Sequence, residues 1–187
     1  MILFRFYFLF FGILFIFNYS NVMANEELKY EVIKKNEVYE IRKYSDRLAV
    51  EAITTNQNSS FRILFNYISG NNQSNEEIQM TTPVTRIKKS GNMMMQFYLP
   101  TRFDQNSAPD PLSNDIKIVN IEGGYYAVLR YSGRASDNNF IKHKDILKNQ
   151  LTKDNMLIIS SSIRATYNSP FTLPAFRRNE AMFKIKY

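Results

Sequence analysis

His143 is the residue of this sequence best suited to binding a metal, because it is the only histidine and there is no cysteine. A neutral imidazole nitrogen can ligate haem iron. His143 lies three residues after Phe140 and four before Leu147, so the three share one face of a predicted helix. The position also suits a partly buried ring held by a hydrogen bond, or an exposed ring between Lys142 and Lys144. His143 is therefore a candidate iron ligand, with both alternatives open.

Most other catalytic and metal chemistry is excluded by the composition. Zinc sites of the usual kind need several cysteines or histidines. A Ser–His–Asp triad would depend on His143, and the sequence has no Gly-x-Ser-x-Gly motif. The paired carboxylates Glu26-Glu27 and Glu76-Glu77 lie in polar stretches, which are poor surroundings for a general acid. We therefore expect a protein without enzymatic activity.

The residue pattern in the first half of the chain predicts four strands and one helix. Alternating apolar and polar residues indicate strands over 38–44, 48–54, 82–88 and 93–99. Ser45-Asp46 and Ser90-Gly91-Asn92 predict hairpin turns, one within each pair of strands. Between the pairs, an apolar helix face with i, i+3, i+4, i+7 spacing is formed by Phe61, Leu64, Phe65 and Ile68.

The second half repeats this order. Strands over 116–121 and 125–131 flank Gly123-Gly124, which is a hairpin signal. Ser136 can cap a helix that carries Phe140 and Leu147, and strands over 156–166 and 181–187 follow. Two hairpin–helix–hairpin repeats related by a pseudo-twofold axis predict an α+β fold. We expect one domain over residues 25–187, a distorted antiparallel β-barrel or curved sheet with two helices.

The N-terminal segment predicts export. Residues 1–24 contain one charge, Arg5, followed by an apolar run from Phe6 to Phe17 and a small-residue cleavage site ending at Ala24. The run is shorter than the roughly 18–20 residues that span a bilayer. We expect a cleaved signal peptide and a periplasmic or secreted protein with no stable membrane span; an uncleaved N-terminal anchor that tethers the protein to a membrane is the alternative.

The chain is basic, with a formal net charge of +7. This charge favours anionic partners. The basic residues are dispersed, however, and the sequence contains no nucleic-acid-binding motif. We expect a monomer that does not bind nucleic acid.

Five motifs occur in a fixed order along the chain. They are Tyr39-Glu40-Ile41-Arg42-Lys43-Tyr44, Tyr67-Ile68-Ser69-Gly70-Asn71, Met80-Thr81-Thr82-Pro83-Val84, Phe97-Tyr98-Leu99-Pro100, and Tyr167-Asn168-Ser169-Pro170-Phe171 running on to Arg177-Arg178-Asn179-Glu180. In this order they resemble the SOUL family of haem-binding proteins, from about Tyr30 to the C-terminus. The resemblance implies a distorted barrel with two helices, and non-covalent binding of haem or another tetrapyrrole for buffering or transfer.

The resemblance also places the tetrapyrrole in an apolar cleft against the first helix. Together with an aromatic lid from the last loop, it gives these candidate binding residues: Phe61, Arg62, Leu64, Phe65, Ile68 and Phe171. Packing on the sheet explains Leu64 and Ile68 equally well. Haem-binding relatives carry basic residues late in this helix, where this sequence reads Phe65-Asn66-Tyr67. That departure keeps open a second function, as a carrier or sensor of another apolar anionic small molecule or a lipid.

Overall fold

The computed structural model of the chain describes residues 25–187 except 56 and 90. The signal peptide predicted over 1–24 lies outside the described residues. The helices and strands follow one another in this order: β1 (Glu26–Glu27), β2 (Glu31–Lys35), β3 (Glu40–Tyr44), β4 (Arg47–Thr54), α1 (Gln57–Ile68), β5 (Thr81–Thr82), β6 (Val84–Lys89), β7 (Asn92–Tyr98), β8 (Ile116–Ile121), β9 (Gly124–Tyr131), α2 (Asp137–Lys153), β10 (Leu157–Ile158), β11 (Ile163–Thr166), a short 3-10 turn (Pro174–Phe176) and β12 (Asn179–Lys186).

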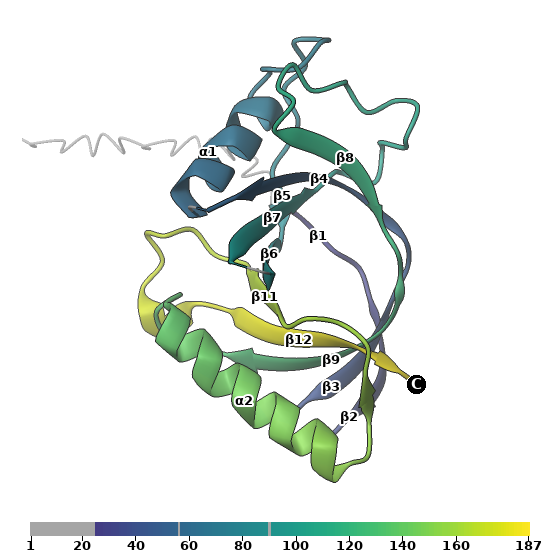
Figure 1. Cartoon of the computed structure of the whole chain (residues 1–187), viewed down its shortest axis with the longest axis vertical. Coiled ribbons are helices and arrows are strands. Elements are labelled where there is room, and N and C mark those ends of the chain that lie inside the picture. Colours follow the sequence, from purple (N-terminus) through teal and green to yellow (C-terminus); the bar gives the residue numbers. More distant parts are fainter. Residues whose placement is uncertain (1–24, 56, 90) are drawn as a thin grey trace, which may run out of the picture.

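One curled antiparallel sheet forms the body of the protein (Figure 1). Its strand order is β2-β3-β9-β12-β11-β6-β7-β4-β8, and β10 pairs with β12 beside this path. Both helices lie on the outer face of the curl, α1 against β4 and β7 and α2 against β9 and β12. The predicted α+β fold, a curved antiparallel sheet with two helices, is confirmed.

Two clusters of the core lie under the helices, because each helix has one apolar face to bury. Under α1, Leu64 and Tyr67 pack with Val50 and Phe97. Under α2, a second cluster includes Leu147 and Leu151. The helix α2 begins as predicted, since the Ser136 hydroxyl accepts a hydrogen bond from the backbone N–H of Asn139 at 3.3 Å.

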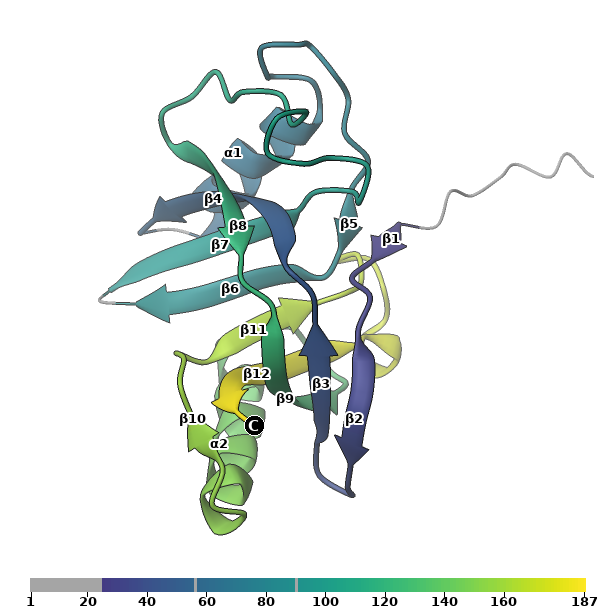
Figure 2. The ribbon, with the colours of Figure 1, turned by 90° about the vertical axis from the view of Figure 1, so that its right-hand side faces the viewer.

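The first strand pair of each repeat differs from the predicted hairpin. Within the described sheet, β3 pairs with β2 and β9, and β4 pairs with β7 and β8. The chain bends from β3 into β4 and from β8 into β9, and the two bent strands lie antiparallel (Figure 2). The register is the same on both sides of the bends, from Glu40 opposite Val128 on one side to Ala52 opposite Ile116 on the other. The hairpins predicted at Ser45-Asp46 and Gly123-Gly124 were therefore wrong.

The reason lies in the contact between the two bends. A Cβ on Gly123 would collide with the carbonyl oxygen of Tyr44 and lie 2.7 Å from the carbonyl carbon of Ser45. The Gly123 N–H also donates to the Asp46 carboxylate at 2.8 Å. Gly123 thus permits close approach of the two bent backbones, and its role is not to turn the chain back on itself.

The second strand pair of each repeat is as predicted. β6 and β7 form an antiparallel hairpin, and β11 and β12 are antiparallel neighbours. The strand predicted over 156–166 is divided into β10 and β11. Among the described residues, no helix is long and apolar enough to cross a membrane.

Candidate functional site

The apolar face of α1 is split between the core and an exposed surface. Leu64 and Ile68 are buried against the sheet, whereas Phe61 and Phe65 are 41% and 48% exposed. The two exposed rings stack on each other with centroids 5.9 Å apart and an interplanar angle of 13°. Phe61 also contacts the buried Phe97 edge-on, with a centroid distance of 5.3 Å. The helix therefore presents a flat aromatic surface that is anchored to the core.

These rings form one wall of a cavity on the outer face, which we call the outer cleft. It has a volume of about 560 Å³. Its other walls come from β6, β7, β11 and the loop that follows β11. The lining residues are Asn25, Phe61, Phe65, Met80, Thr82, Val84, Arg86, Met95, Ala135, Thr166, Tyr167, Asn168, Ser169, Pro170, Arg177 and Asn179. Two of these described residues are cationic and none is acidic, so the cleft suits an apolar molecule that carries negative charge.

The loop wall of the outer cleft is fixed by arginine. Arg177 donates from Nε to the carbonyl oxygen of Thr172 at 2.7 Å and from Nη2 to that of Pro170 at 2.6 Å. The side chain of Asn168 accepts the backbone N–H of Arg178 at 2.6 Å. These bonds hold the loop from Tyr167 to Arg178 in place.

A buried carboxylate lies next to this loop. Glu180 is fully buried and accepts hydrogen bonds from Arg42 at 3.0 Å, Arg178 at 2.9 Å and the Tyr167 hydroxyl at 2.8 Å. Burial, and then the negative charge of Glu180, raise the pKa of Tyr167 well above its usual value. Each oxygen of Glu180 is thus satisfied, and the group stabilises the junction of β3, β11 and β12.

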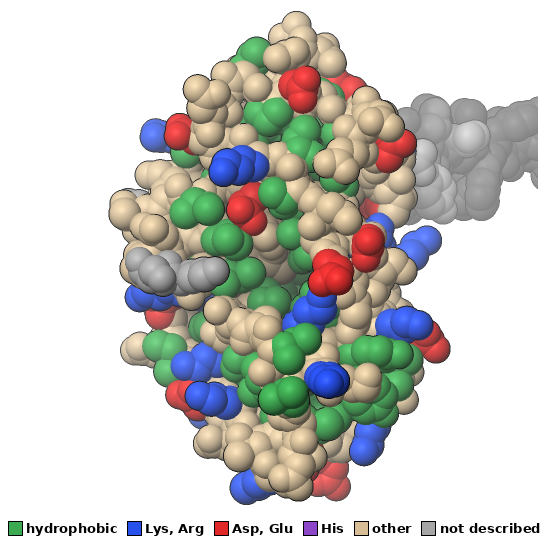
Figure 3. All heavy atoms as spheres, turned by 45° about the vertical axis from the view of Figure 1, so that its right-hand side comes forward, with side chains coloured by type: hydrophobic (Ala, Val, Ile, Leu, Met, Phe, Trp, Pro, Cys, Tyr) green, Lys and Arg blue, Asp and Glu red, His purple; other side chains and the backbone are tan. Residues whose placement is uncertain are grey.

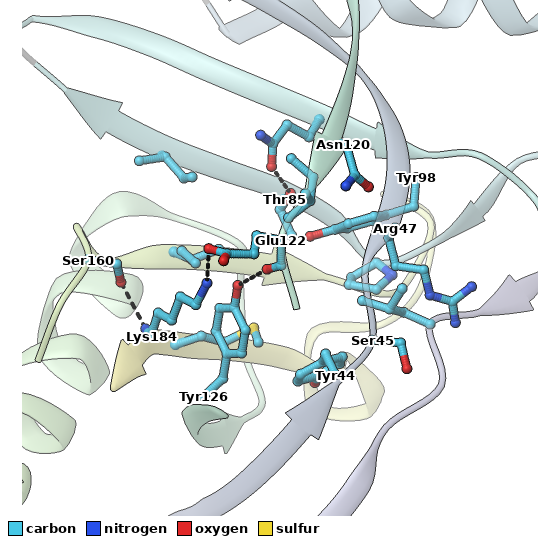
Figure 4. Close-up of a pocket in the computed structure, with 17 residues that line it drawn as sticks. Tyr44, Ser45, Arg47, Thr85, Tyr98, Asn120, Glu122, Tyr126, Ser160 and Lys184 are labelled. Carbon is cyan, nitrogen blue, oxygen red and sulfur yellow. Dashed lines mark hydrogen bonds and ion pairs between the residues drawn. The ribbon is translucent and has the colours of Figure 1, made fainter. Parts of the chain in front are cut away.

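A second cavity, the inner pocket, lies on the inner face of the sheet and has a volume of about 290 Å³. Tyr44, Tyr98 and Tyr126 contribute rings to its walls (Figure 4). Lys184 is neutralised there by Glu122 at 2.8 Å, and the Tyr126 hydroxyl donates to the carbonyl oxygen of Glu122 at 3.2 Å. The space-filling view shows hydrophobic side chains around a hollow on this side of the molecule (Figure 3). The inner pocket is smaller than the outer cleft, and more of its lining residues are tyrosines.

The comparisons with known proteins identify the family. The family model described as SOUL heme-binding protein matches residues 25–184, which is most of the chain. The chain belongs to the SOUL family. Among curated proteins, no sequence relative matches it.

Solved structures with the fold of this SOUL protein share little sequence with it. The C-terminal domain of EcmrR superposes with a TM-score of 0.60 at 10% identity, covering 84% of this chain and 98% of that domain. A hydrolase from Listeria innocua superposes with a TM-score of 0.59 at 8% identity, covering 82% of this chain and 94% of that one. At such low identity these similarities establish the fold alone.

Two of the residues expected from the SOUL resemblance, Phe61 and Phe65, line the outer cleft. Leu64 and Ile68 are core residues, which agrees with the packing alternative. Arg62 is exposed on α1, and Phe171 is 93% exposed at the loop tip. Neither Arg62 nor Phe171 is among the described residues that line the cleft.

His143 lies apart from these residues, on α2. Its ring stacks on Tyr131 with centroids 4.1 Å apart, and its Nδ1 is 2.7 Å from the carbonyl oxygen of Asn139. It does not belong to the described lining of the outer cleft or the inner pocket. The described residues also contain no group of three or more histidines and carboxylates that could hold a metal ion. The geometry matches the alternative of a partly buried, hydrogen-bonded ring.

The cations of the outer cleft were missed from the sequence. Arg86 and Arg177 line the outer cleft, whereas the last turn of α1 contains no basic residue. Arg86 lies two residues after Val84 in β6, and strand alternation indicates only that these two side chains share a face. Which face is the outer one depends on pairing with β11, which is distant in the sequence.

Proposed function

We propose that this SOUL protein binds haem or another tetrapyrrole non-covalently in the outer cleft, for buffering or transfer and without catalysis. The stacked, half-exposed pair Phe61 and Phe65 is the observation that carries the proposal. A flat macrocycle gains both apolar burial and ring stacking on such a surface. Membership of the SOUL family supports the same ligand class.

The charges of the outer cleft fit the acidic edge of a tetrapyrrole. Arg86 and Arg177 are cationic, and no acidic residue is found among the described lining residues. Guanidinium groups match carboxylates with two parallel hydrogen bonds. The thioethers of Met80 and Met95 in the same wall offer an adaptable apolar surface. The haem would therefore be held by stacking, burial and charge.

Replacing both phenylalanines by alanine should weaken haemin binding at least about tenfold, because stacking contributes roughly 0.5–1.5 kcal/mol per ring beyond burial. The measurement is a titration of the purified protein with haemin, followed at the Soret band. We expect saturation at one haemin per chain for the wild type, and a higher Kd for the Phe61→Ala/Phe65→Ala variant.

Two control variants should behave as the wild type. Tyr187→Ala removes an exposed ring outside the outer cleft and the inner pocket. His143→Ala removes the imidazole on α2 that is stacked on the ring of Tyr131. An equal loss of affinity in Tyr187→Ala would indicate non-specific binding, and a changed Soret maximum in His143→Ala would make that residue an iron ligand. Failure of the wild type to saturate would refute haem binding.

The alternative function is binding of a different apolar anionic molecule or a lipid, and the inner pocket favours it. Its volume of about 290 Å³ and its tyrosine walls suit a ligand smaller than a tetrapyrrole. A ligand of this pocket would bind equally to the wild type and to the Phe61→Ala/Phe65→Ala variant. Isothermal titration calorimetry of the wild type and of this variant would therefore distinguish binding in the inner pocket from binding in the outer cleft.

We also propose that the protein is exported to the periplasm or secreted, as the residue pattern of 1–24 supports. Expression of the whole chain should yield a mature protein that begins at Asn25, which intact mass and N-terminal sequencing would establish. A full-length product retained in the membrane fraction would instead support the tethered form.

A further inference from the structure

Two buried arginines lie side by side on the outer face of the sheet. Arg86 of β6 is directly opposite Arg164 of β11 in the antiparallel register. They are only 7% and 4% exposed. Like charges facing each other across two strands destabilise a sheet, and burial increases the effect. An arrangement of this kind indicates that a further negative charge belongs at the site.

The hydrogen bonds of this arginine pair are incomplete. Nε and Nη1 of Arg86, and Nε and Nη2 of Arg164, are buried without a partner in the part of the chain that the structure describes. Of the carboxylates in residues 25–187 that the structure describes, only that of Asp137 reaches the pair: it accepts from Nη1 of Arg164 at 2.9 Å, and its side chain is 75% exposed. Four buried donors on two cations are therefore left for an acceptor from outside the protein.

The surroundings point to the same conclusion. The Tyr131 hydroxyl is also buried and has no partner among the described residues. Burial raises the pKa of Tyr131, while the charges of Arg164 and Arg86 oppose this change. Burial and then the charge of Arg164 lower the pKa of Arg86 to about 10. A bound anion would relieve the repulsion that lowers the Arg86 pKa.

The arginine pair is reached through a third cavity, the side cavity, of about 230 Å³. It is lined by Arg86, Lys88, Met93, Asp137, Phe140, Ile141, Lys144, Ser162 and Arg164. Four of these residues are cationic and one is acidic. Arg86 also lines the outer cleft, so a group bound at the pair would lie where the two cavities meet.

We infer that Arg86 and Arg164 form a binding site for an oxyanion, a carboxylate or phosphate group, at the junction of the outer cleft and the side cavity. The planar fork of each guanidinium matches two oxygens of such a group. The anion is either an acidic group of the ligand in the outer cleft or a free anion. Only the first of these sources rests on the proposed function.

Thermal unfolding of the purified protein tests the site without any tetrapyrrole. Inorganic phosphate and acetate are compared with chloride at equal ionic strength. We expect phosphate or acetate to raise the Tm of the wild type by about 5–10 °C at 100 times its Kd. The Arg86→Met/Arg164→Met variant should show no such rise. It should also fold at least as stably as the wild type in chloride, because it removes two facing buried charges.

A matched variant and a second titration complete the experiment. Arg102→Met removes an arginine that is 57% exposed and paired with Glu76, so it should keep the full anion effect. If the anion belongs to the ligand, the double variant should bind haemin at least about tenfold more weakly and haemin dimethyl ester with unchanged affinity. A phosphate effect with unchanged haemin binding would assign the site to a free anion. The inference is overturned if neither anion raises the wild-type Tm more than that of the double variant and both proteins bind haemin equally.

Discussion

Glu180→Ala should lower the free energy of unfolding by about 3–5 kcal/mol, the usual cost of removing one partner from a buried ion pair. The carboxylate is fully buried, and two guanidiniums, those of Arg42 and Arg178, bond to it. Without it, the Tyr167 hydroxyl also loses its acceptor. Urea unfolding followed by circular dichroism would measure the change.

Two comparisons make this expectation specific to the buried carboxylate. Glu180→Gln keeps the volume and one acceptor oxygen, so it should lose less stability than Glu180→Ala. Glu122→Ala breaks the ion pair with Lys184, but the Glu122 side chain is 85% exposed, and the cost should be below about 1 kcal/mol. Equal effects of Glu180→Ala and Glu122→Ala would contradict the assigned role of Glu180.

Leu64→Ala should lower the free energy of unfolding by about 2.7–5 kcal/mol. It should leave the residues that line the outer cleft unchanged. Leu64 is fully buried beneath α1, and truncation of such a leucine loses apolar burial and leaves a cavity. Chemical unfolding measures the stability, and a haemin titration below the unfolding transition measures the affinity. We expect a large change in the first and less than about a twofold change in the second.

The neighbouring residue provides the opposite pattern. Phe65→Ala removes a ring that is 48% exposed, so its effect on stability should be well below that of Leu64→Ala. Its effect on haemin affinity should be the larger of the two. If Leu64→Ala also weakened haemin binding strongly while the protein stayed folded, the division of the α1 face between core and cleft would be wrong.

The elements that depend on local pattern could be predicted from the sequence. The helix face that contains Phe61 and Leu64 has the 3.6-residue period, and Ser136 is a good N-cap; both predictions are confirmed. The hairpin between β6 and β7 is also local. The sequence predicts hairpins at Ser45-Asp46 and Gly123-Gly124, where the structure has bends, because the same residues permit a turn and a close approach of two strands. Only the register of strands whose paired residues are 64 to 88 positions apart in the sequence distinguishes the two cases.

The candidate site was less predictable for the same reason. Periodicity placed Phe65 and Leu64 on one helix face but could not tell which side of that face meets the sheet. Arg86 and Arg164 are 78 residues apart, and they become neighbours only through the pairing of β6 with β11. Their missing hydrogen bonds depend on the complete set of surrounding side chains. A sequence pattern therefore cannot show that a buried guanidinium lacks hydrogen-bond partners.

The two bent strands have a consequence for the origin of the fold. In the sheet, β4 of the first repeat takes β8 of the second as its neighbour, and β9 of the second takes β3 of the first. A solitary repeat would thus expose three unpaired strand edges, because β6 of the first repeat also takes β11 of the second as its neighbour. Two identical copies that paired through these strands would cover all three edges. The present chain has the connectivity expected if a strand-exchanged homodimer became one polypeptide through gene duplication and fusion.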